Sequence, residues 1–264
     1  MNTGFDIVIW AQNPDASLVE TAASLAAQTD RQFGVVLSDN HSSVGQNHLD
    51  TTHKKLLSAG ISVRRVTPPG ELSRIEHWNW AHSQSQAAWL KPLSPGEHLK
   101  PLFVERLKQR ISERPKAQVI RCDIELRTEW GPEILTAPFE LASISAGEFT
   151  NYFPAHLEWV SHSGNFAYGR TAWQAMGGYS IHQPASAALN LNVMLSLHHG
   201  LENLPETLVS AEWPAHDNRR ERISYLMELW LILLQARNYC LAARLPWTSR
   251  CLLLRSLTAA LRRR

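Results

Sequence analysis

The chain has 264 residues, of which 44% are hydrophobic and 19% are charged, and its formal net charge is +2. This composition is ordinary for a soluble globular protein, the length suffices for a sizeable core, and so small a charge does not indicate nucleic-acid binding. The cysteines Cys122, Cys240 and Cys251 are few and far apart. Their number and spacing exclude a disulfide framework and a zinc-ligand pattern, and they favour a reducing compartment.

Neither end of the chain carries an obvious export or membrane-spanning signal. Residues Met1 to Asp6 lack a basic patch followed by an apolar run, so we expect no secretory signal. The longest strongly apolar run, Leu226–Ala236, is interrupted by Glu228 and Gln235 and is too short to span a bilayer. These features predict a cytoplasmic protein.

Apolar runs of strand length alternate with helical periodicity in the first half of the chain. Between the runs, apolar residues recur at helical spacing from Leu18 to Ala26 and from Leu102 to Ile111. Short apolar strands separated by helices predict an α/β fold with a mostly parallel sheet flanked by helices on both faces. The predicted strands cover Phe5–Trp10, Phe33–Leu37, Ile61–Val66, Ala88–Leu93 and Gln118–Cys122.

Polar stretches follow three of these strands. They are Ala11–Pro14, Ser38–Ser43 and Ser94–Glu97. Each stretch alone is typical of a turn, since Asn, Asp, Ser, Pro and Gly dominate turns for local reasons. Ligands of parallel sheets bind at the carboxyl ends of strands, so three such stretches together predict a ligand-binding cleft.

Several further motifs occur in a characteristic order. They are the strand and loop Phe5–Asn13, a helix closing on Gln28-Thr29, the strand Val35–Asn40, the segment His77–Ala81, the strand Trp89–Leu93 followed by Glu97 and Pro101, Gly164-Asn165-Phe166 followed by Gly177-Gly178-Tyr179, and His216 after a strand-like Thr207–Glu212. In this order and at this spacing, residues 5 to about 220 resemble the family 2 glycosyltransferases of the GT-A fold.

The resemblance implies a GT-A-like, Rossmann-type domain with a nucleotide-sugar site. Asp39 would contact the nucleoside, with support from Gln12 and Asn13. Glu97 and His216 would bind a divalent cation, Mn²⁺ or Mg²⁺, which neutralises the diphosphate leaving group as the sugar bond breaks. Carboxylate oxygens suit both ions, and Mn²⁺ also accepts an imidazole.

Lys91, just before the turn at Ser94–Glu97, is a further candidate for phosphate contact. Its alternative interpretation is a solvated lysine at the end of a strand.

The sequence departs from the family in two places. Only Glu97 remains of the acidic metal motif, and the position of the usual catalytic Asp falls at Leu189 or Asn190, neither of which takes a proton at neutral pH. No Asp or Glu occurs from Trp159 through Leu201. Histidines of this region could supply the base, and the sequence does not choose among them. These histidines are His162, His182, His198 and His199.

Two functions follow from these observations. The first is transfer of a sugar from a nucleotide-sugar donor to a glycan or lipid-linked acceptor, with inversion as the family default. The alternative is a catalytically impaired relative that binds a nucleotide sugar, a glycan or a protein partner.

A change of composition divides the chain into a domain over residues 1–218 and a basic helical tail over 219–264. Apolar residues recur at helical spacing from Tyr225 to Leu234, and Leu252–Leu261 forms a second amphipathic piece that ends in three arginines. Such a tail is typical of peripheral contact with the inner face of a cell membrane, and equally of a helix packed over the domain's own core. A more distant interpretation is a membrane-surface adaptor that acts mainly through the tail. No nucleic-acid reader motif accompanies the basic residues, so nucleic acid is not an expected partner.

Overall fold

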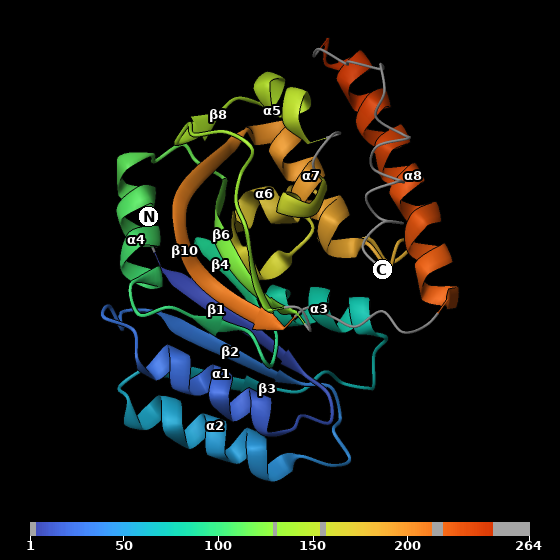
Figure 1. Cartoon of the computed structure of the whole chain (residues 1–264). Coiled ribbons are helices and arrows are strands. Elements are labelled where there is room, and N and C mark those ends of the chain that lie inside the picture. The colour runs from blue at the N-terminus through green and yellow to red at the C-terminus, as the bar shows by residue number, and fades with distance from the viewer. Residues whose placement is uncertain (1–3, 129–130, 154–156, 213–218, 245–264) are drawn as a thin grey trace.

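The computed structural model describes residues 4–128, 131–153, 157–212 and 219–244 (Figure 1). The strands are β1 (Phe5–Ala11), β2 (Gly34–Asp39), β3 (Ser62–Val66), β4 (Trp89–Leu93), β5 (His98–Leu99), β6 (Val119–Thr128), β7 (Gly131–Leu135), β8 (Ser143–Ile144), β9 (Phe166–Gly169) and β10 (Leu201–Glu212). The helices are α1 (Ala16–Ala26), α2 (Gln46–Ser58), α3 (Arg74–Ser83), α4 (Phe103–Glu113), α5 (Ala146–Tyr152), α6 (Arg170–Ala175), α7 (Ala187–His199) and α8 (Arg219–Ala242), with 3₁₀ turns η1 (Leu157–Val160) and η2 (Ser163–Asn165).

The described strands form one sheet of two halves. Its order is β3-β2-β1-β4-β9-β6-β10-β5, with β7 beside β6 and β8 beside β10. The first half, β3-β2-β1-β4, is parallel throughout. In the second half β9 runs antiparallel to both β4 and β6, whereas β10 is parallel to β6. The prediction of an α/β fold with a mostly parallel, helix-flanked sheet is confirmed.

The register of the parallel half brings three strand ends together. Ala11 of β1 lies opposite Asp39 of β2, and Ile9 of β1 lies opposite Leu93 of β4. The polar stretches that follow these strands therefore meet at one edge of the sheet, as the sequence predicts for a ligand-binding cleft.

Side chains of alternating direction build a core on each face of the sheet. Along β1, Ile7 and Ile9 join the core under α1, α2 and α4, whereas Val8 and Trp10 join the core under α3 and α7. Figure 1 shows α8 outermost on the second side. Its buried residues, such as Ile232 and Ala236, belong to that same core.

The sequence patterns predict the helices and strands best where the period of the hydrophobic residues is clear. The predicted strands of the parallel half match β1 to β4, and the helical spacing from Tyr225 to Leu234 lies within α8. The stretch Arg127–Thr150 has no clear period in the sequence, and it holds β7, β8 and the start of α5. The second amphipathic piece, Leu252–Leu261, lies outside the described residues.

Two further sequence features can be placed in part. Cys122 and Cys240 are free thiols in the core, and Cys251 lies outside the described residues. Among the helices that the structure describes, none combines the length and apolar character needed to cross a membrane.

Candidate functional site

Asp39 ends β2 with its carboxylate held by the loop that follows. It accepts hydrogen bonds from the Ser42 backbone N–H at 3.0 Å, from the Ser42 hydroxyl at 2.5 Å and from Gln46 Nε2 at 3.1 Å. Burial raises the pKa of Asp39, but these hydrogen bonds and the charge of Arg65 outweigh it and hold the pKa below its usual value. Asp39 is therefore an ionised acceptor at neutral pH.

Asn13 joins the loop after β1 to the loop after β2. Its Oδ1 accepts hydrogen bonds from the backbone N–H groups of Ser43 at 2.8 Å and Val44 at 3.2 Å, and its own N–H donates to Ser42 Oγ at 2.8 Å. Its φ of 50° is left-handed, which Asn tolerates better than most residues. Asn13 and Asp39 thus belong to one hydrogen-bonded unit at the cleft.

Gln12 and Asn40 connect this unit to the loop before α3. Gln12 Nε2 donates to Glu71 Oε1 at 2.8 Å on the exposed rim. Asn40 is buried, donates to the Leu72 carbonyl at 2.8 Å and accepts from the Leu72 N–H at 3.0 Å. Asn13 therefore lies in the hydrogen-bonded loops that hold Asp39, whereas Gln12 contacts Glu71 on the rim.

Glu97 lies in the turn after β4 and is almost completely buried. Its Oε2 accepts the Ser94 N–H at 2.8 Å, and its Oε1 lies 3.4 Å from His162 Nδ1. A Cβ atom on Gly164 would come within 2.5 Å of Glu97 Oε1. Glycine at position 164 therefore lets the backbone of η2 pack directly against this carboxylate.

His162 is positioned by α7. Asn192 Nδ2 donates to the carbonyls of Val160 at 2.7 Å and His162 at 3.3 Å, and Asn192 Oδ1 accepts the Tyr168 hydroxyl at 2.5 Å. Burial lowers the pKa of His162. The charge of Glu97 raises this pKa and the charge of Lys91 lowers it, and the net result is a pKa below the ordinary value of histidine. The imidazole is therefore neutral at pH 7 and able to accept a proton.

Two buried polar atoms of the segment His162–Asn165, which packs against Glu97, lack a hydrogen-bond partner among the described residues. They are His162 Nδ1, whose contact with Glu97 does not have hydrogen-bond geometry, and Asn165 Oδ1. The other end of the Asn165 amide donates to the Cys122 carbonyl at 2.8 Å, so the side chain is firmly held. Buried polar groups are normally paired, and unpaired ones at a cleft are suited to a ligand.

The structure does not bring Lys91 to the cleft. Its side chain is fully buried, its Nζ lies 5.5 Å from the centroid of the Phe103 ring, and it donates to the neighbouring Pro92 carbonyl. Burial lowers the pKa of Lys91 to about 8. Neither the phosphate contact nor the solvated lysine expected from the sequence fits this placement, because Lys91 is on the strand face that packs against α4.

One of the two predicted metal ligands can be placed. Glu97 is at the cleft, and His216 lies outside the described residues. Within the part of the chain that the structure describes, no three His, Cys, Asp or Glu side chains are grouped so that they could hold a metal ion.

The structure distinguishes among the candidate bases. Leu189 is buried, and Asn190 Nδ2 donates to the side-chain oxygens of Gln183 and Gln235. His182 is exposed in the loop before α7. His198 and His199 lie at the carboxyl end of α7. Of these four histidines, His162 is the one in contact with Glu97.

Several tryptophans near the candidate site are core residues. Trp89, Trp159 and Trp173 are each less than 8% exposed. Trp78 and Trp80 are half-buried, and the Trp78 ring centroid lies 4.9 Å from that of Trp10. Core packing is therefore the role of the first three, whereas Trp78 and Trp80 have partly open faces.

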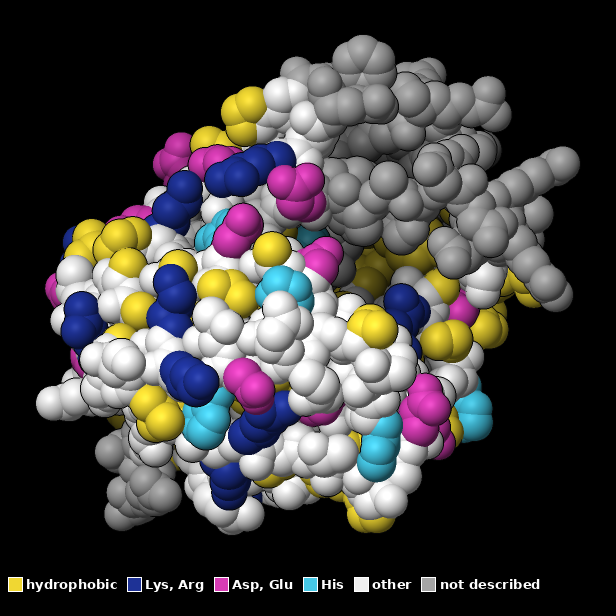
Figure 2. All heavy atoms as spheres, turned by 90° about the horizontal axis from the view of Figure 1, so that it is seen from below, with side chains coloured by type: hydrophobic (Ala, Val, Ile, Leu, Met, Phe, Trp, Pro, Cys, Tyr) yellow, Lys and Arg dark blue, Asp and Glu magenta, His cyan; other side chains and the backbone are white. Residues whose placement is uncertain are grey.

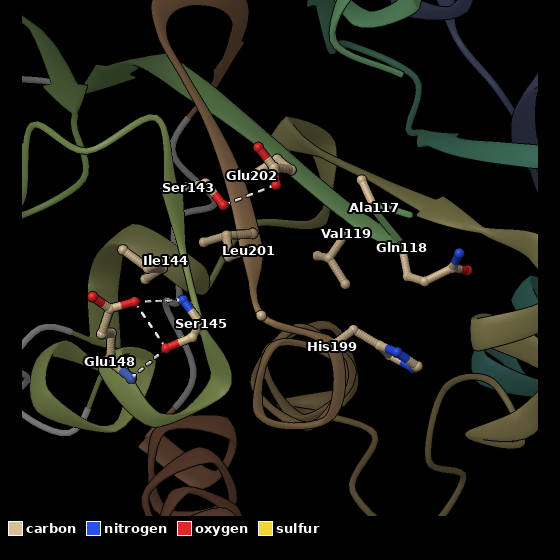
Figure 3. Close-up of a pocket in the computed structure, with 11 residues that line it drawn as sticks. Ala117, Gln118, Val119, Ser143, Ile144, Ser145, Glu148, His199, Leu201 and Glu202 are labelled. Atoms are coloured by element: carbon tan, nitrogen blue, oxygen red, sulfur yellow. Dashed lines mark hydrogen bonds between the residues drawn. The ribbon is translucent and has the colours of Figure 1, made fainter. Parts of the chain in front are cut away.

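A hollow of about 340 Å³ lies at the opposite edge of the sheet, where β6 and β10 begin. Figure 3 shows that its acidic groups face protein partners: Glu148 turns back to Ser145, and Glu202 meets Ser143. His199 points away from both acids. The side chains of this hollow therefore do not converge on one point.

No protein-family model matches the sequence, and no curated protein matches it. Solved structures do match. TarS 1–349 of S. aureus in complex with UDP-GlcNAc has a TM-score of 0.68 at 12% identity, over 88% of this chain and 66% of that chain. The same fragment in complex with UDP has a TM-score of 0.66 at 12% identity, over 90% and 72%.

The mannosyltransferase PcManGT of Pyrobaculum calidifontis in complex with GDP-Man and Mn²⁺ has a TM-score of 0.62 at 11% identity, over 89% of this chain and 64% of that chain. This chain thus spans about two thirds of the length of these structures. The fold is that of GT-A glycosyltransferases, and at these identities the likeness concerns the fold alone.

Proposed function

We propose that this chain is a family 2 glycosyltransferase that moves a sugar, with inversion, from a nucleotide-sugar donor to a glycan or lipid-linked acceptor. The observation that carries the proposal is the meeting of Asp39 and Glu97 at one edge of a GT-A sheet. The two carboxylates follow β2 and β4, which flank β1, so two inter-strand spacings of about 10 Å in total separate the strands. That span suits a nucleoside at one end and a diphosphate at the other.

Asp39 and Asn13 would hold the nucleoside. An ionised carboxylate accepts hydrogen bonds from ribose hydroxyls or base N–H groups, and charge-assisted hydrogen bonds are the stronger kind. The link between Asn13 and the Ser42–Val44 backbone fixes both loops before a ligand arrives. Preorganisation of this sort reduces the entropy lost on binding.

Glu97 and His216 would hold a divalent cation. The Glu97 carboxylate carries one hydrogen bond from Ser94, which leaves lone pairs on both oxygens, and an oxygen and imidazole donor set fits Mn²⁺. When bound, the cation would neutralise charge on the diphosphate. The buried Lys91 adds positive charge beneath Glu97 without touching the ligand.

His162 would act as general base in place of the family's Asp. The Glu97 carboxylate, 3.4 Å from His162 Nδ1, would stabilise the imidazolium that forms when His162 takes a proton. His162 would take the proton of the acceptor hydroxyl as that oxygen attacks the sugar carbon, and the nucleoside diphosphate would leave.

A second candidate function is binding without catalysis, in a protein of the same fold. The specific observation in its favour is the absence of an acid on α7, where Asn190 is engaged by Gln183 and Gln235. Release of UDP or GDP from a panel of nucleotide sugars distinguishes the two. Slow turnover that disappears in His162→Asn supports the enzyme, and tight binding of a donor with no turnover supports the binding protein.

The test of the site is calorimetric titration of UDP and GDP, with and without Mn²⁺. We expect binding of one nucleotide that Mn²⁺ strengthens, that Asp39→Asn weakens in either condition, and that loses its Mn²⁺ dependence in Glu97→Gln and His216→Ala. Asp30→Asn, at an Asp paired with Lys108 near the opposite end of β2, is the matched control. Failure of both nucleotides to bind would contradict the proposal for these donors.

Glu97 is proposed both to bind the cation and to lie beside the base His162. Nucleotide titration and turnover of the Glu97→Gln variant, measured together, separate these two roles. Loss of the Mn²⁺ effect in Glu97→Gln identifies a cation ligand. Unchanged binding with loss of turnover identifies a positioning residue for His162.

A cytoplasmic location, with the tail at the inner face of a membrane, completes the proposal and rests on the sequence of residues 219–264.

A further inference from the structure

Helix α8 is anchored to the domain by its inner face. Leu229, Ile232 and Ala236 are buried in the core that α7 shares. The Tyr239 ring of α8 stacks on His198, at the carboxyl end of α7, with a centroid distance of 4.1 Å. The orientation of α8 is therefore fixed by packing along much of its length.

A buried acid fixes α8 at the start of α7. The carboxylate of Glu228 accepts hydrogen bonds from the backbone N–H and the hydroxyl of Ser186, both at 2.8 Å. Ser186 directly precedes α7. The Glu228 carboxylate is therefore held inside the protein and does not contribute charge to the outer surface of α8.

The outer face of α8 is apolar. Its large side chains are between 38% and 67% exposed, and their spacing of three, four and seven residues places them along one side of the helix. A contiguous apolar surface of this kind usually marks a contact with a partner or a membrane. The residues are Met227, Trp230, Leu231, Leu234 and Leu241.

The described, exposed charges around this apolar stripe are basic, and the start of α8 adds Arg219, Arg220 and Arg222 against one acid, Glu221, in the sequence. On the described side chains of residues 224–244 the exposed charged groups are Arg237 and Arg244, while the acid Glu228 is buried. Residues 245–264 add five arginines and no Asp or Glu to the sequence. An apolar stripe with basic neighbours is complementary to anionic lipid headgroups above an acyl layer.

Another face of the protein provides a contrast. Figure 2 views the molecule from the side of α1 and α2, where basic, acidic and histidine side chains are interspersed. The mixture is typical of a solvated surface. The outer face of α8 has a different composition, which points to a different environment.

A second copy of this chain fits the stripe less well than a lipid surface. Pairing two identical α8 faces would bring arginines from both copies to the same interface, and none of the described, exposed side chains of either helix is acidic. Like charges at an interface oppose association. An anionic membrane supplies the missing negative charge.

We propose that the outer face of α8 docks onto an anionic membrane, with the helix lying in the plane of the interface. Met227, Trp230, Leu231 and Leu234 enter the boundary between headgroups and acyl chains, and Arg237 and Arg244 contact the anionic headgroups. The docking does not depend on sugar transfer. It does bring the α7 side of the sheet close to the lipid surface, where a lipid-linked acceptor would be found.

The test is sedimentation of the full chain with vesicles, in the absence of nucleotide. We expect binding to phosphatidylcholine vesicles that contain phosphatidylglycerol and much weaker binding to phosphatidylcholine alone. The double substitution Leu231→Ser with Leu234→Ser should lower the partition coefficient about tenfold, since transfer of each apolar side chain into the interface contributes to binding. Arg237→Gln with Arg244→Gln should weaken binding to the anionic vesicles only.

Leu57→Ser is the matched control, because Leu57 is 51% exposed on the distant helix α2. Circular dichroism of each variant shows whether the fold is retained. Undiminished vesicle binding in the Leu231/Leu234 variant would overturn the proposal. Concentration-dependent dimerisation that this variant abolishes, without vesicle binding by the parent chain, would instead identify a second copy as the occupant. Nucleotide titration of the same samples keeps failure of this docking separate from failure of the proposed transferase site.

Discussion

The two ends of the candidate cleft are built differently. At the end proposed to hold the nucleoside, Asp39 and Asn13 are already engaged by the loops around them. At the end proposed for sugar transfer, His162 Nδ1 and Asn165 Oδ1 are buried without a hydrogen-bond partner among the described residues. The side chains of the first end are paired without a ligand, whereas the segment His162–Asn165, which packs against Glu97, has free hydrogen-bonding capacity.

This difference suggests a division of labour. A prearranged hydrogen-bonded loop favours tight and selective binding, because few groups need to be ordered when the ligand arrives. Unpaired buried polar groups are costly in the free protein, and they are tolerated where a reacting group or an ion will meet them. The following substitutions test that contrast, from the largest expected effect to the smallest.

The largest effect is expected at the transfer end. His162→Asn removes the proposed base, so kcat should fall by about 10²- to 10⁴-fold while the affinity for the nucleotide changes little. The parent enzyme should lose activity only below pH 6.5, the ordinary pKa of histidine, because burial lowers the pKa of His162. Steady-state kinetics across pH measures both effects.

His182→Asn is the control for this prediction, since His182 is exposed in the same part of the chain. Equal losses in both variants would show that His162 has no special role. A fall in nucleotide affinity with unchanged kcat would remove the contrast between the two ends.

The next effect is expected at the nucleoside end. Asp39→Asn should weaken nucleotide binding by about tenfold to a hundredfold, since it removes a charged acceptor without changing the shape of the side chain. The pKa of Asp39 is lowered in the folded protein, so its contribution to stability is present above pH 3.8 and is lost as the pH falls through the folded value. Calorimetry and thermal unfolding against pH check these two expectations.

A third substitution tests the buried positive charge of Lys91 beneath Glu97. The pKa of Lys91 is lowered from 10.5 to about 8, so the charged form destabilises the fold below pH 8, and this cost fades as the pH rises toward 10.5. Lys91→Met should therefore raise the free energy of unfolding by about 2 kcal/mol at pH 7, with little gain at pH 10. Denaturant unfolding at the two pH values measures the difference, and an equal gain at both would contradict this explanation.

The smallest effect is expected where α3 meets the Gly177–Tyr179 segment. Asn79 donates to the Tyr179 carbonyl at 2.9 Å and accepts the Tyr179 N–H at 2.8 Å. Asn79→Ala should lower the free energy of unfolding by about 1 kcal/mol, because it leaves two backbone groups of Tyr179 unpaired. Ser83→Ala, on the exposed end of the same helix, is the control, and a similar loss there would show that removal of any polar side chain from α3 explains the effect.

The sequence was sufficient to predict Asp39 and Asn13, but it did not predict most of the surroundings of Glu97. Asp39 and Asn13 were predictable because polar residues directly after buried parallel strands must meet at one edge. The partner of Glu97 was not, because His162 and Glu97 are 65 positions apart and no periodic pattern connects them. Local pattern also gave no reason to expect the burial of Lys91, which depends on how α4 packs over β4.

The most direct test of the central claim is hydrogen–deuterium exchange with and without the nucleotide sugar that binds best. Nucleotide should protect the amides of residues 11–14, 39–46 and 94–97, and Asp39→Asn should reduce that protection at the same nucleotide concentration. Protection at residues 117–119, 143–148 and 199–202, which line the hollow at the opposite edge, would place the ligand elsewhere and contradict the account.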